Sequence, residues 1–141
     1  MLIAGQLLGE LQGLLDGASG GLRVVSAATD VEPIHLVRAG ARAFGPSVYF
    51  GVPGGDELGG LGVAWQASAS GPDRLRRLEA AIAARQLPAD VRVAVGFSFA
   101  DDGSAAGEWE GYPPATALLP AVSIVKTVAG SRLVVALPAG A

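Results

Sequence analysis

The sequence predicts an α+β fold, with a largely antiparallel sheet and helices packed on one face. Segments with helical spacing are interspersed with strand-like segments, and two short connections between strand-like segments require antiparallel pairing. Half of the 141 residues are hydrophobic and only 16% are charged, against about 25% in an average soluble domain. The chain must therefore bury a core, and its length suits a single domain over 1–141.

The first expected element is an amphipathic helix within residues 2–16, followed by a turn at 16–21. Leu7, Leu11 and Leu14 recur at helical spacing, and the stretch DGASGG then breaks the pattern. Residues 22–28 predict a strand. Pro33 suits the first turn of the helix that follows.

The middle of the chain predicts a hairpin around a glycine-rich stretch. We expect strands at 46–52 and 61–69 to pair, with Gly54 and Gly55 free to take positive φ in the turn. A phosphate-binding loop is disfavoured, because no lysine or hydroxyl residue follows Gly59 or Gly60. The dinucleotide fingerprint is also disfavoured, because the stretch leads into a strand instead of a helix.

The clearest helix is expected over 71–88. Pro72 suits its first position, Pro88 marks its end, and the apolar stripe consists of Leu75, Leu78 and Ile82.

The second half predicts strands and one polar loop. Residues 91–100 alternate cleanly and predict a core strand with one apolar face. A loop rich in glycine and proline follows at 101–115, and 118–128 with 133–137 predict a closing hairpin. The apolar face of the strand at 91–100 comprises Val91, Val93, Val95, Phe97 and Phe99.

Charge and composition exclude several classes of function. The net charge is −3 and no basic patch is visible, which argues against nucleic-acid binding. The absence of cysteine excludes disulfides and thiolate metal sites, and a single histidine excludes a multi-histidine site. No signal peptide or membrane-spanning segment is expected, so we expect a cytoplasmic protein. Arg74, Arg76 and Arg77 lie among acidic neighbours and predict a solvated helix face.

Single residues that could carry chemistry all have simpler explanations. His35 lies in a predicted helix, and Asp101 with Asp102 follows a strand, where such acids usually cap a turn. Lys126 is the only lysine and could act as a general base, but strand alternation places it on one face with Ile124 and Val128, or lets its stem reach an edge. No catalytic, cofactor-binding or metal-binding residue is therefore assigned. Three further aromatic residues are too far apart in sequence to form a stacking platform: Trp65, Trp109 and Tyr112.

Several pieces taken together resemble the amino-terminal region of isochorismate synthases, which are chorismate-utilising enzymes. The resemblance covers about 22–137, including the first strand and helix at 22–40. The remaining pieces, in order, are Tyr49-Phe50, Leu61-Gly62-Val63-Ala64, Gly96-Phe97-Ser98-Phe99, Trp109-Glu110-Gly111-Tyr112-Pro113 and Leu119-Pro120.

This resemblance implies the amino-terminal half of a four-layer α/β/β/α fold. In the family, the lysine that acts as base, the glutamate that acts as acid and the Mg²⁺-binding glutamates lie in the carboxy-terminal part. None of these segments is in this chain. Lys126 stands in a similar-looking segment but in the strand that precedes the catalytic one, so its role is not carried over. The resemblance thus implies chorismate and Mg²⁺ for a full-length enzyme, and no cofactor for this chain.

Three hypotheses follow. The first is a truncated, split or excised amino-terminal portion of an isochorismate synthase, an isomerase serving menaquinone or salicylate-type siderophore synthesis, that is inactive without its carboxy-terminal half. The second is a free-standing, non-catalytic α+β domain that binds a partner chain. The third, ranked lower, is a related enzyme making anthranilate or aminodeoxychorismate. High apolar content is consistent with a surface that packs against further polypeptide.

Overall fold

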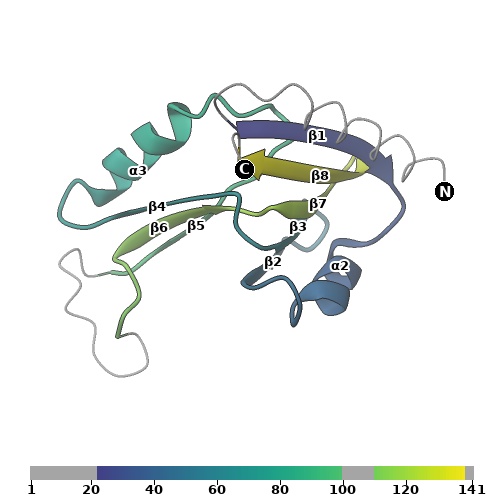
Figure 1. Cartoon of the computed structure of the whole chain (residues 1–141), viewed down its shortest axis with the longest axis horizontal. Helices are drawn as coiled ribbons and strands as arrows, with labels where there is room; N and C mark the ends of the chain where they lie inside the picture. Colours follow the sequence, from purple (N-terminus) through teal and green to yellow (C-terminus); the bar gives the residue numbers. More distant parts are fainter. Residues whose placement is uncertain (1–21, 100–109, 139–141) are drawn as a thin grey trace.

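The computed structural model describes residues 22–99 and 110–138, and these confirm the α+β class with antiparallel strand pairing (Figure 1). The helix expected within 2–16 and the turn at 16–21 lie outside the described residues. The bounds of the elements are β1 Leu22–Thr29, α2 Pro33–Gly40, β2 Ser47–Gly51, β3 Glu57–Leu61, β4 Trp65–Ala69, α3 Arg74–Ala83, β5 Ala94–Phe97, β6 Ala115–Leu119, β7 Val122–Thr127 and β8 Gly130–Pro138.

The strands form two sheets, and each sheet carries one helix. The larger sheet has the order β1-β8-β7-β3-β2, and the smaller has the order β4-β6-β5. The chain passes between the sheets from β3 to β4 and again from β6 to β7. At this crossing the Ala64 amide donates to the Leu119 carbonyl over 2.8 Å, and Gly62 takes a φ of +69°. The two sheets are therefore joined by a bent, two-stranded ribbon.

The partner of β2 differs from the predicted one. Residues 61–69 were expected to pair with 46–52, but the partner is β3, in the register Ser47↔Leu61 to Gly51↔Glu57. The turn is tight, because the Val52 amide donates to the Asp56 carbonyl over 3.1 Å and Gly54 has a φ of +71°. The strand that runs antiparallel to β2 thus begins already at Glu57. It then bends at Gly62, which carries β4 into the smaller sheet.

The segment predicted as one strand over 118–128 is two strands. Pro120 separates β6 from β7, because proline has no amide hydrogen to continue a ladder. The predicted closing hairpin is confirmed for β7 and β8, whose register ends at Thr127↔Gly130.

The predicted core strand over 91–100 is only partly a core strand. Val91 is buried and Val93 packs against the core, but Val95 and Phe97 in β5 are 50% and 60% exposed, and Phe99 is fully exposed. β5 lies at the edge of the smaller sheet. α3 packs on β4 and β6, and the exposure of Val95 and Phe97 shows that the outer part of this face is left uncovered by the described residues.

α3 is shorter than the predicted helix over 71–88. It ends near Ala84, and Gln86 then takes a φ of +50°, which is incompatible with a continuing helix. Leu78 is buried as expected and Ile82 packs on the same cluster, but Leu75 is 44% exposed. Neither helix within 22–99 and 110–138 is long and apolar enough to cross a membrane.

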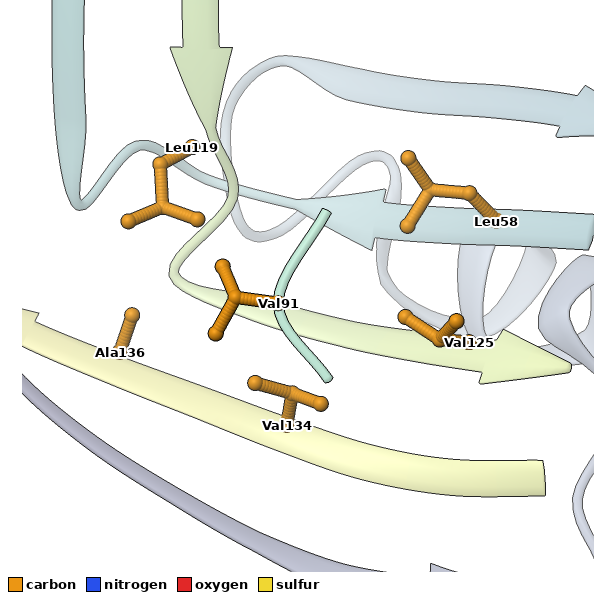
Figure 2. Packing of buried hydrophobic residues seen from close by; sticks show 6 residues of the cluster. All are labelled: Leu58, Val91, Leu119, Val125, Val134 and Ala136. Carbon is orange, nitrogen blue, oxygen red and sulfur yellow. The ribbon is translucent and has the colours of Figure 1, made fainter. Parts of the chain in front are cut away.

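A single apolar cluster connects the larger sheet to the junction with the smaller one. Val91 lies in the segment that crosses the larger sheet, and Figure 2 shows its side chain amid those of the sheet residues. Leu119 is 1% exposed and lies at the end of β6, where the ribbon bends. The six buried members of this cluster are Leu58, Val91, Leu119, Val125, Val134 and Ala136.

α2 lies against β3 at positions where side chains are absent. A Cβ atom built on Gly59 would come within 2.2 Å of the Pro33 carbonyl oxygen, and one on Gly40 within 2.3 Å of Leu61 Cδ1. A Cβ on Gly60 would come within 2.5 Å of the Pro120 ring. The glycine pair in β3 therefore permits the close approach of the helix on one face and of the bent ribbon on the other.

Candidate functional site

The first candidate site is an apolar surface at the edge of β5 and around β2. Val95 and Phe97 are exposed on β5, and Phe50 is 62% exposed on β2. Large apolar side chains exposed together usually mark a surface that binds another molecule. We call Phe50, Val95 and Phe97 the apolar surface.

A cavity of about 450 Å³ connects the two sides of this surface. Val48, Phe50 and Leu58 line it from the larger sheet, and Val93 and Val95 line it from the segment leading into β5. Apolar cavities of this size accept side chains or small ligands. Asp56, Glu57 and Arg92 also line the cavity. Its wall is thus mostly apolar and includes three charged residues.

The second candidate site is a charged cluster on the opposite face of the larger sheet. Lys126 Nζ lies 2.8 Å from Glu32 Oε2 and 3.1 Å from its Oε1, and 3.9 Å from Glu57 Oε2. The Tyr49 hydroxyl donates to Glu57 Oε1 over 2.8 Å. The charged cluster, Glu32, Tyr49, Glu57 and Lys126, thus joins the start of α2 to β2, β3 and β7.

Lys126 is held in its protonated state by this arrangement. The hydrogen bond to Glu32, followed by the charge of Glu32, raises the lysine pKa above its ordinary value. A general base works best when its pKa lies near the working pH. Lys126 in this state binds carboxylates and is poorly suited to accepting a proton.

Tyr49 is held in its neutral state. Its hydrogen bond to Glu57 raises the tyrosine pKa, because ionisation would remove the donated proton and place a phenolate beside a carboxylate. The contact with Glu57 therefore contributes stability below pH about 10, the ordinary pKa of tyrosine, and this contribution is lost as the pH rises through the folded-state value.

We expect substitutions of Glu57 to lower the Tyr49 pKa in steps. Glu57→Gln removes the charge but keeps an acceptor, and Glu57→Ala removes both, so the pKa should fall further in the second variant. The chain has two tyrosines, so ultraviolet titration of the phenolate in a Tyr112→Phe background measures Tyr49 alone. An unchanged Tyr49 pKa in both variants would contradict the hydrogen bond to Glu57.

The residues singled out in the sequence do not gather at one place. His35 lies in α2 with an exposed side chain, and Lys126 lies in the charged cluster on the same face as buried Ile124. Trp65 packs in the core with Arg85 stacked at 5.2 Å from its ring centroid, whereas Tyr112 is exposed. Asp101, Asp102 and Trp109 lie outside the described residues.

The arginine cluster of α3 only partly forms a solvated face. Arg76 and Arg77 are exposed, while half-buried Arg74 donates to the Ser98 carbonyl over 2.8 Å. Arg77 donates to the Ser70 carbonyl. Arg77 and Arg74 thus bind the main chain just beyond the ends of β4 and β5, respectively, in addition to facing solvent.

Sequence reasoning missed three members of the charged cluster. Glu32, Tyr49 and Glu57 are far apart in the sequence, and Glu57 was assigned only to a turn. One available signal was Lys126, since a lone lysine inside a hydrophobic strand needs an acidic partner when its face is covered. Which acid supplies the partner depends on the β3–β7 register, Glu57↔Lys126.

Comparison with known proteins shows a likeness of fold alone. No protein-family model matches the sequence, and no curated protein matches it. The fold is similar to part of a solved isochorismate synthase. That structure is MenF, the menaquinone-specific isochorismate synthase from Escherichia coli, with a TM-score of 0.58 and 20% sequence identity. The match covers 94% of this chain and 29% of that chain, so this chain spans less than a third of its length.

Proposed function

We propose that this chain is the amino-terminal, non-catalytic portion of an isochorismate synthase, which isomerises chorismate to isochorismate. The observation that carries the proposal is the likeness to MenF over 94% of the chain. The whole enzyme would be a cytoplasmic isomerase using Mg²⁺, and menaquinone synthesis is the preferred pathway because the similar structure is menaquinone-specific. Salicylate-type siderophore synthesis is the alternative pathway.

The ion pair of Lys126 fits a non-catalytic role for this residue. Isomerising chorismate means adding water at one ring carbon and expelling hydroxide from another, which requires a base, an acid and a metal for the carboxylates. Lys126 is protonated and paired with Glu32. In this proposal the base, the acid and the Mg²⁺ ligands come from a carboxy-terminal half, and so does the binding of chorismate.

The apolar surface supports the same proposal. Phe50, Val95 and Phe97 expose apolar area that further polypeptide of the enzyme would cover. The same surface also favours a second candidate function, a free-standing domain that binds a separate partner chain. The two differ in whether the covering polypeptide belongs to the same reading frame.

The reading frame beyond Ala141 separates these two functions. A downstream segment of the type K-V-V-x-[AS]-R supports the isochorismate synthase portion, whereas a stop codon favours the free-standing domain.

An activity assay tests the non-catalytic role directly. Purified 1–141 is expected to show no turnover of chorismate with Mg²⁺, while the longer protein, or 1–141 combined with its downstream polypeptide, forms isochorismate. MenF serves as the positive control for the assay. Isochorismate formation by 1–141 alone would contradict the non-catalytic role.

A further inference from the structure

The main chain of β5 has an open edge whose direction can be deduced from its pairing with β6. The Ser98 amide donates to the Pro114 carbonyl over 2.8 Å, immediately beyond the register Phe97↔Ala115. In an antiparallel pair, alternate residues turn their amide and carbonyl groups toward the same neighbour. Ala94 and Gly96 therefore point to β6 with Ser98, while Val95 and Phe97 point their main-chain groups the other way.

No other strand in the described ranges pairs with this side of β5. Val95 and Phe97 thus present two amides and two carbonyls together with exposed apolar side chains. Such an edge readily accepts another strand, and protein sheets usually protect it with charge, proline or a covering element.

The other edge strands in the described ranges carry polar protection. β1 contains Arg23, and β4 alternates its apolar residues with Gln66 and Ser68. β2 contains Tyr49, which is bonded to Glu57 beside Lys126. β5 reads AVGF and has no polar side chain. Its composition is that of a strand inside a sheet, although its position is at an edge.

The face that Val95 and Phe97 share is also incomplete. Their register partners Ala117 and Ala115 are fully buried, and these alanines form a cluster with Leu78 of α3. Beyond them, the apolar character continues onto β5, where Val95 and Phe97 are left half exposed or more by the described residues. A strand added beside β5 would extend both the hydrogen-bond ladder and this apolar face.

We propose that β5 pairs through Val95 and Phe97 with an extended apolar strand from the carboxy-terminal half of the same protein. This rests on the proposed function, which supplies the occupant: the chain spans 29% of the similar structure, so a protein of that size has abundant further polypeptide. Main-chain hydrogen bonds give such pairing its affinity, and alternate side chains give its specificity.

Amide hydrogen exchange tests this pairing at single residues. In 1–141 alone, the amides of Val95 and Phe97 should exchange rapidly, while that of Ser98, which is bonded to Pro114, should exchange more slowly. Adding the polypeptide encoded directly downstream of Ala141 should slow the amide exchange of Val95 and Phe97 at least tenfold. The exchange of the Ser98 amide should change little.

A proline variant provides the matched perturbation. Val95→Pro removes an amide that points to the open edge and leaves the amides pointing to β6 in place, so it should weaken binding of the downstream polypeptide at least tenfold. Val95→Thr keeps the amide and a β-branched side chain and should retain binding. Ser98 protection in Val95→Pro reports whether the chain itself remains folded.

The outcomes separate this proposal from the proposed function. Binding with isochorismate formation but without slowed exchange at Val95 and Phe97 would overturn the β5 pairing alone. Slowed exchange without isochorismate formation would support the pairing and reject the enzyme. A reading frame that ends at Ala141, or a downstream polypeptide that does not bind, would overturn both. Concentration-dependent protection in 1–141 alone would identify a second copy as the occupant and overturn the proposed one.

Discussion

Replacing Gly59 with alanine is expected to destabilise the fold by about 3 kcal/mol or more. The added Cβ would lie 2.2 Å from the Pro33 carbonyl oxygen and 2.7 Å from the Pro33 carbonyl carbon. These are main-chain atoms at the start of α2, so no side-chain rotation relieves the overlap. The helix must move off β3, and the contact between the two elements is lost over several residues.

Chemical denaturation of the chain measures this effect, and Gly96→Ala is the matched control. Gly96 also lies in a strand, but a Cβ there would meet nothing closer than Thr116 Cγ2 at 3.9 Å. Its stability should be unchanged or slightly raised, because alanine restricts the unfolded chain. Equal denaturation midpoints for the two variants would show that α2 does not lie on Gly59.

The second large effect is expected for Leu119→Ala, with a loss of about 2–5 kcal/mol in the free energy of unfolding. Leu119 is 1% exposed and packs in the cluster with Val91. It also lies where the ribbon bends between the two sheets, and its carbonyl accepts the hydrogen bond from the Ala64 amide. Truncation of this side chain leaves a cavity that the residues around the bent ribbon can fill only in part.

Leu75→Ala is the control for Leu119→Ala. The same atoms are removed from a side chain in α3 that is 44% exposed. The loss in the free energy of unfolding should therefore be well under that of Leu119→Ala. Denaturation midpoints of the two variants give the comparison. A loss at Leu75 as large as that at Leu119 would contradict the buried position of Leu119 at the junction.

Much of the local structure could be predicted because it depends on short-range patterns. The β7–β8 hairpin is defined by alternation and a glycine-containing turn, and α3 by apolar spacing around Leu78. The turn at Gly54 follows from the ability of glycine to take positive φ. The predicted length of α3 was wrong at its carboxy-terminal end, where Gln86 adopts a positive φ that its residue type does not predict.

The errors in strand pairing have one physical origin. A hydrophobic alternation predicts a strand but does not state its neighbour. The strand at Trp65–Ala69 pairs with β6 and not with β2, because the chain bends at Gly62. Likewise, alternation in β5 correctly grouped Val95 with Phe97 on one face, but the burial of that face depends on which elements cover it. Such information is tertiary and is absent from the pattern.

The two candidate sites differ in how far they could be predicted from the sequence. The apolar excess in the composition predicts that some apolar side chains stay exposed, and β5 and β2 carry such side chains. The further polypeptide that would cover them stays a prediction. The charged cluster was not foreseen, because Glu32, Glu57 and Lys126 come together through the packing of α2 and the register of β3 with β7.

The glycine-rich stretch separates local from tertiary information most clearly. From residue types alone, it was predicted to turn a hairpin and to lack the lysine of a phosphate-binding loop, because both properties depend on neighbours in sequence. The close contacts of Gly59 with Pro33 and of Gly60 with Pro120 arise from elements distant in sequence. Residue order therefore predicts most of the turns, strands and helices in the described ranges, although not all of their bounds. The packing of those elements decides which glycines are required and which hydrophobic residues stay exposed.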